Sequence, residues 1–189
     1  MLPDGLAIIC LLQREDPRDV LICSRAASLD ELPPGATVGT SSLRRQALLL
    51  RARPDLRVVP FRGNVQTRLT KLDAGEVDAT LLALAGLRRL GLEGVMASPL
   101  SVEQMLPAVA QGAIGIEARM NDAHIAQLLR PLNHPATEYC VTAERAFLAA
   151  LDGSCRTPLA ALAELLPAGR MRIRGQIVKP DGSQLFEAT

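Results

Sequence analysis

Three strand-to-helix junctions between residues 36 and 90 constrain the fold of this chain most strongly. Short apolar runs end at Val38, Phe61 and Leu84, and each run leads into a segment that reads as a helix. Strands that alternate with helices at this interval are typical of a parallel sheet covered by helices on both faces. The sequence therefore predicts an α/β fold.

Each junction also carries glycine and arginine, and these residues are Gly39, Arg44 and Arg45, then Arg62, Gly63 and Arg68, then Gly86, Arg88 and Arg89. The carboxyl ends of parallel strands lie along one edge of a sheet, where open α/β sheets bind ligands. We therefore expect the arginines to converge in space. The pattern predicts a site for a small ligand with several carboxylates.

The first junction has an unusual charge for a helix start. Thr40, Ser41 and Ser42 are good N-cap residues, yet Arg44 and Arg45 follow them at an end that prefers negative charge. An anion held by the free backbone N–H groups, the hydroxyls and the guanidinium groups would resolve this conflict. The alternative is that both arginines point into water, and this stretch alone does not decide between the two.

Composition excludes several functions. The 189 residues carry a net charge of +1 and only 2% aromatic residues, which argues against a nucleic-acid partner. No apolar run is long enough to cross a membrane, and the cysteines and histidines lack metal-ligand spacing, so we expect neither a membrane partner nor a metal. Without a secretory signal, free thiols in the cytoplasm are expected, and Cys10, Cys23 and Cys140 read as buried hydrophobic residues.

The chain is expected to divide into four segments. Residues 1–17 read as a connector and strand of a first domain that lacks its start, and residues 18–106 as an α/β domain. A return segment to the first domain, 107–131, contains a glycine-punctuated strand over 108–117. Residues 132–189 read as a small α+β domain that is itself shortened, with a long helix, strands and a hairpin.

Cys155 differs from the other cysteines because it lies in a polar loop next to Arg156. A neighbouring cation favours the thiolate form. No histidine lies close in sequence to act as a base, so a protease-like nucleophile is weakly supported. A cysteine that anchors a covalent group needs fewer assisting residues than a catalytic nucleophile does. Residue chemistry alone leaves both an inert and a functional role open for Cys155.

Several stretches in register closely resemble the porphobilinogen deaminase, or hydroxymethylbilane synthase, family: residues 38–45, 56–72, 84–92, 106–112 and 143–148. The resemblance implies two domains of the periplasmic-binding-protein α/β type, with a parallel-rich sheet, and a small α+β C-terminal domain. It also implies a transferase of haem and tetrapyrrole biosynthesis. This enzyme condenses four porphobilinogen units head to tail, with release of ammonia, on a dipyrromethane cofactor.

The family match assigns residues as follows. The cofactor is held through a thioether to Cys155, in a Gly-Ser-Cys sequence where the family usually has Gly-Gly-Cys, and Ala110 replaces a usual glycine. The cofactor contacts are expected from Thr40, Ser42, Arg44, Arg45, Arg62, Gly63, Ala83 and Gly86. The substrate contacts are expected from Arg62, Arg68 and Arg89.

One departure concerns catalysis. The family's acid/base aspartate belongs to a His-Ser-Leu-Lys-Asp motif, and this sequence has none, so its catalytic residue is unknown. We therefore expect a fragment of the enzyme that is inactive alone and tends to self-associate, although the family is usually monomeric. The alternative is a catalytically inactive anion-binding fragment of the periplasmic-binding-protein type, which would need neither Cys155 nor the helix near residue 143.

Overall fold

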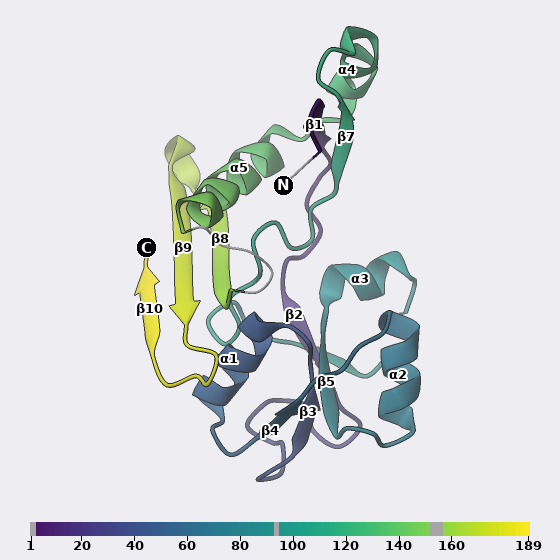
Figure 1. Cartoon of the computed structure of the whole chain (residues 1–189), viewed down its shortest axis with the longest axis vertical. Helices are drawn as coiled ribbons and strands as arrows, with labels where there is room; N and C mark the ends of the chain where they lie inside the picture. The colour runs from purple at the N-terminus through teal and green to yellow at the C-terminus, as the bar shows by residue number, and fades with distance from the viewer. Residues whose placement is uncertain (1–2, 93–94, 152–156) are drawn as a thin grey trace.

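The computed structural model describes residues 3–92, 95–151 and 157–189, and the described strands form three sheets (Figure 1). A five-stranded sheet occupies one end of the molecule, a three-stranded sheet lies beside it, and a two-stranded ribbon extends away from both. The described residues thus combine a larger sheet and its helices with a smaller α+β unit, as the sequence predicts, but the larger sheet is mixed rather than wholly parallel.

The five-stranded sheet has the order β4 (Arg57–Val59), β3 (Thr37–Gly39), β5 (Ala79–Ala83), β2 (Asp19–Ile22) and β6 (Ala97–Pro99). Strand β3 is parallel to both β4 and β5, while β2 is antiparallel to β5 and β6. The three junctions predicted from the sequence follow β3, β4 and β5. Because these strands are parallel neighbours, the junctions lie at one edge of the sheet.

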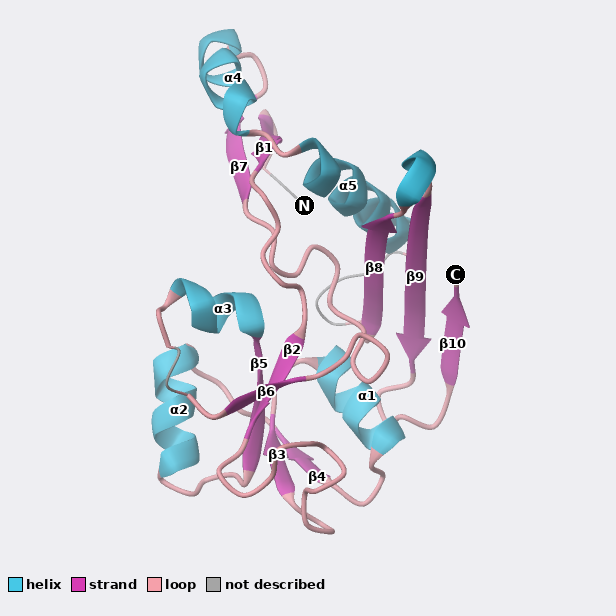
Figure 2. Cartoon of the chain, turned by 180° about the vertical axis from the view of Figure 1, so that it is seen from behind, coloured by secondary structure: helices cyan, strands magenta, loops and turns pink. Residues whose placement is uncertain are grey.

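Helices cover both faces of this sheet (Figures 1 and 2). Helix α1 (Leu43–Ala52) packs on one face, and α2 (Val65–Asp73) and α3 (Leu84–Arg89) pack on the other. Alternate strand residues supply the two cores: Leu21 and Leu81 face α1, whereas Val20 and Leu82 face α2 and α3. This alternation follows from the two-residue period of a strand.

The two-stranded ribbon pairs β1 (Leu6–Leu11) with β7 (Gly115–Arg119) and carries α4 (Ala123–Leu129) and a 3₁₀ turn, η1 (Arg130–Leu132), at its far end (Figure 1). Two segments connect this ribbon to the larger sheet and run side by side. The Leu12 N–H donates to the Ile114 carbonyl at 3.0 Å, and the Glu15 N–H donates to the Gly112 carbonyl at 3.1 Å. We call residues 12–18 and 107–114 the crossing segments.

The small α+β unit consists of α5 (Pro135–Ala150), β8 (Leu159–Leu165), η2 (Pro167–Gly169), β9 (Met171–Val178) and β10 (Leu185–Ala188). Its sheet has the order β10-β9-β8, and α5 packs against β8 (Figure 2). The predicted hairpin joins β9 to β10. Its turn lies against α1, where the Gln46 side chain donates to the Pro180 carbonyl at 3.4 Å.

One expectation needs adjustment. The glycine-punctuated strand expected within residues 108–117 is β7, which begins only at Gly115 and runs to Arg119, because the preceding residues form turns in which Ala110 and Gly112 have φ values of 59° and 85°. Asp19, within the α/β domain expected over residues 18–106, begins β2 and is fully buried. The domain boundaries themselves remain a prediction.

The expected burial of three cysteines is confirmed. Cys10, Cys23 and Cys140 are buried free thiols. Burial raises the pKa of the Cys140 thiol, as does the nearby Glu144 carboxylate, which keeps this cysteine protonated. None of the described helices is long and apolar enough to cross a membrane.

Candidate functional site

The site begins at the N-terminus of α1, where three hydroxyls organise the turn after β3. Ser42 is the N-cap, and its hydroxyl accepts from the Arg45 N–H at 3.4 Å. The Thr40 hydroxyl accepts from the Ser42 N–H, and the Ser41 hydroxyl accepts from the Phe61 N–H that follows β4. The N-cap prediction is confirmed, and the hydroxyls tie two of the three junctions together.

Arg44 and Arg45 do not point into water, because both bind Asp19 at the start of β2. Arg44 Nη1 donates to Asp19 Oδ2 at 2.7 Å, and Arg45 donates to Asp19 Oδ1 through Nε at 3.0 Å and Nη2 at 2.7 Å. The Arg44 side chain is only 5% exposed. The chain itself therefore supplies an anion at this helix start, which the sequence analysis did not foresee.

Asp19 remains ionised in this setting. Burial acts to raise its pKa, but the charges of Arg44 and Arg45 and their hydrogen bonds outweigh that effect and lower the pKa. A guanidinium group stays protonated at neutral pH even when buried. One buried carboxylate is therefore the counter-ion of two cations, the buried Arg44 and the partly exposed Arg45.

A pocket of about 360 Å³ opens in front of these arginines. Its polar wall contains Ser41, Ser42, Arg44, Arg45 and Arg68, and its apolar wall contains Ala108, Val109, Leu148, Thr157 and Leu159. The walls thus come from the α1 junction, helix α2, a crossing segment and the α+β unit. The volume lies in the range of small-ligand sites, roughly 300–1,000 Å³.

The pocket retains unused hydrogen-bond donors. Arg44 Nε is buried and has no hydrogen-bond partner among the described residues. Arg68 adds a third cation, whose Nε donates to the Gly63 carbonyl at 2.9 Å. Burial, together with repulsion from Arg45, lowers the pKa of Arg68. This donor set suits a ligand that carries carboxylates.

The other predicted site residues lie around this edge, but they do not line the pocket. Thr40 is buried, and Ala83 ends β5 directly opposite Asp19 in the ladder. Arg62 and Arg89 are exposed, and Arg89 donates to the Gly112 carbonyl at 3.0 Å. Gly63 has a φ of 132°, and a Cβ there would come within 2.8 Å of Thr67, while Gly86 lies within α3.

Cys155 lies outside the described residues, which resume at Thr157. Thr157 lines the pocket and follows Cys155 by only two residues in the sequence. The place of Thr157 in the pocket wall is the structural observation that bears on the prediction that Cys155 anchors a group beside the arginines.

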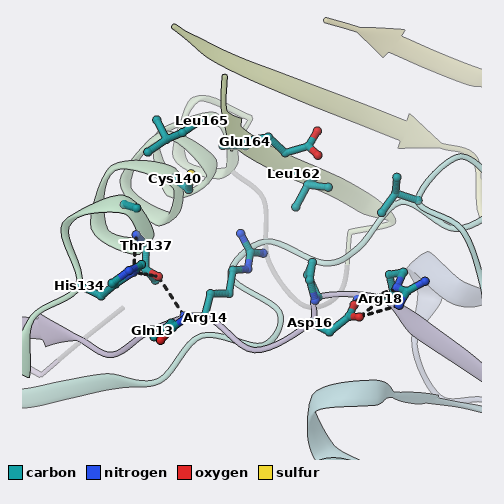
Figure 3. A pocket seen from close by; sticks show the side chains of 14 residues that line it. Gln13, Arg14, Asp16, Arg18, His134, Thr137, Cys140, Leu162, Glu164 and Leu165 are labelled. Carbon is teal, nitrogen blue, oxygen red and sulfur yellow. Dashed lines mark hydrogen bonds and ion pairs between the residues drawn. The ribbon is translucent and has the colours of Figure 1, made fainter. Parts of the chain in front are cut away.

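A larger cavity of about 530 Å³ lies elsewhere, between one crossing segment, α5 and β8 (Figure 3). Its charged residues are already paired, since Arg18 binds Asp16 at 2.7 Å and Arg14 binds Glu144. His134 and Thr137 bind each other at 2.9 Å. We place the candidate site at the smaller pocket because the unused donors lie there.

Sequence reasoning missed the polar residues that support the site from behind. Gln111 donates to the Pro17 carbonyl at 2.6 Å and to Asp19 Oδ1 at 3.0 Å, and it accepts from Arg44 Nη2 at 3.3 Å. Glu144 is fully buried on α5 and binds Arg14. The only available signal was an aspartate, Asp19, directly before the apolar run of β2.

Solved structures offer only a weak comparison. A periplasmic binding protein of Salmonella typhimurium has a TM-score of 0.41 and 13% identity, over 74% of this chain and 63% of that protein. A lipoprotein of the YaeC family from Enterococcus faecalis V583 has a TM-score of 0.43 and 12% identity, over 75% and 68% of the two chains.

The comparison with families and curated proteins is much stronger. Residues 1–127 match the family description "Porphobilinogen deaminase, dipyromethane cofactor binding domain", and residues 138–189 match "Porphobilinogen deaminase, C-terminal domain". Porphobilinogen deaminase of Paracoccus denitrificans (strain Pd 1222) is 55% identical over 186 residues, which are 98% of this chain and 59% of that protein. The chloroplastic porphobilinogen deaminase of Oryza sativa subsp. japonica is 54% identical over 188 residues, which are 100% of this chain and 52% of that protein.

The fold and the pocket define an α/β protein with arginines gathered at one edge of its larger sheet. The chain belongs to the porphobilinogen deaminase family, whose relatives are transferases and whose matched domain binds dipyrromethane. The chain spans between half and three-fifths of the length of these curated relatives. The alternative of a periplasmic-type binding module is not favoured, because the match includes the family's C-terminal domain.

Proposed function

We propose that this chain contributes the anion-holding part of a transferase that joins four porphobilinogen units head to tail, with release of ammonia, in tetrapyrrole biosynthesis. The observation that carries the proposal is the pocket in which Arg44, Arg45 and Arg68 line one wall and Thr157, two residues after Cys155, lines the other. Each pyrrole ring of such a substrate carries an acetate and a propionate. Two cations at the start of α1 and a third on α2 suit a ligand with this charge.

Dipyrromethane, joined through a thioether to Cys155, would supply the acceptor pyrrole for chain growth. The buried Nε of Arg44, which lacks a partner among the described residues, fits a carboxylate-bearing group at this place. Ser42, Arg44 and Arg45 would hold the group from the α1 side, with Thr40 and Ala83 shaping the turn and strand behind them.

The exposed cations would serve the incoming and growing polypyrrole. Arg62 and Arg89 lie on the same sheet edge as the pocket, at the junctions after β4 and β5, and Arg68 reaches the pocket from α2. Gly63 and Gly86 would let the backbone approach the ligand at the same two junctions. No residue of this chain is assigned as the catalytic acid or base.

We also propose a cytoplasmic location, with porphobilinogen and polypyrroles as the binding partners. The described cysteines Cys10, Cys23 and Cys140 are free thiols, as a reducing compartment maintains them.

Calorimetric titration tests the proposed site. The ligand is a dipyrromethane that bears acetate and propionate groups but lacks a leaving group, and the protein carries Cys155→Ser so that the pocket starts empty. Replacing Arg68 or Arg62 with leucine should weaken binding by about 1.5–3 kcal/mol, the range for a hydrogen bond to a charged group. Arg172→Leu is the matched control, because Arg172 is 43% exposed on β9 and pairs only with Glu164 in the described residues. Unchanged affinity in both the Arg62 and Arg68 variants would contradict the proposed site.

A further inference from the structure

The two arginines at the start of α1 share a single counter-ion. Asp19 is fully buried and does not line the pocket, yet it touches Arg44 through one carboxylate oxygen and Arg45 through the other. Each guanidinium has five N–H groups. Arg44 uses them in bonds to Asp19, the Leu106 carbonyl and Gln111, and Arg45 uses them in bonds to Asp19 and the Leu81 carbonyl. These bonds occupy only part of the ten donors, so both arginines can still bind a ligand.

Gln111 keeps Asp19 in this position. Its amide donates to Asp19 Oδ1 and to the Pro17 carbonyl, and its oxygen accepts from Arg44. Asp19 is also held by its place in β2, where it pairs with Ala83 in the ladder to β5. The carboxylate is therefore a fixed part of the site rather than a group that moves aside for a ligand.

The nearby carboxylates cannot substitute for Asp19. Asp16 is paired with Arg18, Glu15 with Arg88, and Glu144 with Arg14. Among the described carboxylates, Asp19 is the one that binds the pocket arginines. It reduces the three positive charges of Arg44, Arg45 and Arg68 to a net of two.

We propose that Asp19 is a specificity-determining residue that sets how strongly this pocket binds anions. It fixes the orientation of Arg44 and Arg45 and at the same time opposes a bound carboxylate. The pocket thereby holds a polycarboxylate less tightly than its arginines alone would. This inference rests on the proposed function. It adds that Asp19, which does not touch the ligand, limits the affinity of the pocket for a polycarboxylate.

Four proteins in the Cys155→Ser background test this: the parent, Asp19→Asn, Arg44→Met, and the double variant Arg44→Met/Asp19→Asn. Affinity for the same dipyrromethane polycarboxylate is measured by calorimetry at low and high salt. Asp19→Asn should tighten binding about tenfold in both the Arg44 and the Arg44→Met backgrounds, because a buried negative charge near the ligand is removed. The gain should shrink at high salt, since screening weakens charge interactions. Asp16→Asn is the matched control and should leave affinity unchanged, because Asp16 is paired with Arg18.

The outcomes separate the two proposals. A purely structural role for Asp19 predicts that Asp19→Asn weakens ligand binding in both backgrounds. If a folded Asp19→Asn protein binds the ligand with equal or weaker affinity, the inference about Asp19 is overturned, whereas the proposed function is not. If Asp19→Asn does not fold with Arg44 present, the comparison of Arg44→Met with Arg44→Met/Asp19→Asn tests the inference. The double variant lacks both the buried cation and the buried anion, so neither charge is left unpaired by loss of the other. No binding by the parent would overturn the proposed function, and the inference with it.

Discussion

Arg14 and Glu144 form a buried ion pair between residues separated by 130 positions in the sequence. Arg14 Nη1 lies 2.5 Å from Glu144 Oε1, and Nη2 lies 3.2 Å from Oε2. Glu144 also accepts from the Ala110 N–H and the Ala163 N–H, and Arg14 Nε donates to the Gln111 carbonyl. One carboxylate on α5 thus joins both crossing segments to β8.

Breaking this pair should destabilise the fold. Arg14→Met leaves the fully buried Glu144 without its cation, so the free energy of unfolding should fall by about 3–5 kcal/mol. Urea denaturation at pH 7 measures the change. The control is Arg172→Met, which removes an exposed pair and should change stability by about 0–1 kcal/mol. Equal changes in the free energy of unfolding would show that the buried pair stabilises the fold no more than the exposed pair does.

The turn at Gly112 should not tolerate a side chain. Gly112 has a φ of 85°, and a Cβ there would lie 2.5 Å from the Glu15 carbonyl oxygen of the other crossing segment. Gly75 has a similar φ of 77° with nothing within 4 Å of its Cβ. Gly75→Ala should therefore cost only about 1–2 kcal/mol for the left-handed conformation, and Gly112→Ala clearly more. The difference in melting temperature between the two variants measures the effect of the contact with the Glu15 carbonyl oxygen. Similar melting temperatures would show that this contact does not destabilise Gly112→Ala.

Cys155 should carry the covalent group. Protein produced with the complete family sequence upstream of this chain should have an intact mass that exceeds the sequence mass by one dipyrromethane unit. Cys155→Ser should return the mass to that of the bare polypeptide. Cys10→Ser and Cys140→Ser should keep the added mass, because both thiols are buried. An adduct that survives in Cys155→Ser would place the anchor at another residue.

Asp19 should also shape the acid stability of the chain. Its pKa in the folded state is lowered, whereas in the unfolded state it is about 3.9. The stabilisation by Asp19 is therefore present above about pH 4 and is lost as the pH falls through the folded-state pKa. The difference in unfolding free energy between the parent and Asp19→Asn, from urea titrations at pH 7 and pH 3, should narrow at the lower pH. A difference that stays constant would show that Asp19 does not titrate with unfolding.

Local patterns were sufficient to predict most elements. The apolar runs at β3 and β5 and the helical period of α2 gave elements within a few residues of those observed. Capping residues located the start of α1, since the Ser42 side chain accepts from the Arg45 N–H of the first turn.

By itself, the sequence determined the α/β class, the order of the elements and the gathering of arginines where three parallel strands of the sheet end. These properties follow from periods and caps that act over a few residues. Only the tertiary structure decided which arginines are free. Asp19 and Arg44 are 25 positions apart, and Gln111 is 67 positions beyond Arg44. Whether a charge binds a ligand or an internal partner depends on contacts between such distant residues, because burial and pairing arise only when the chain has folded around them.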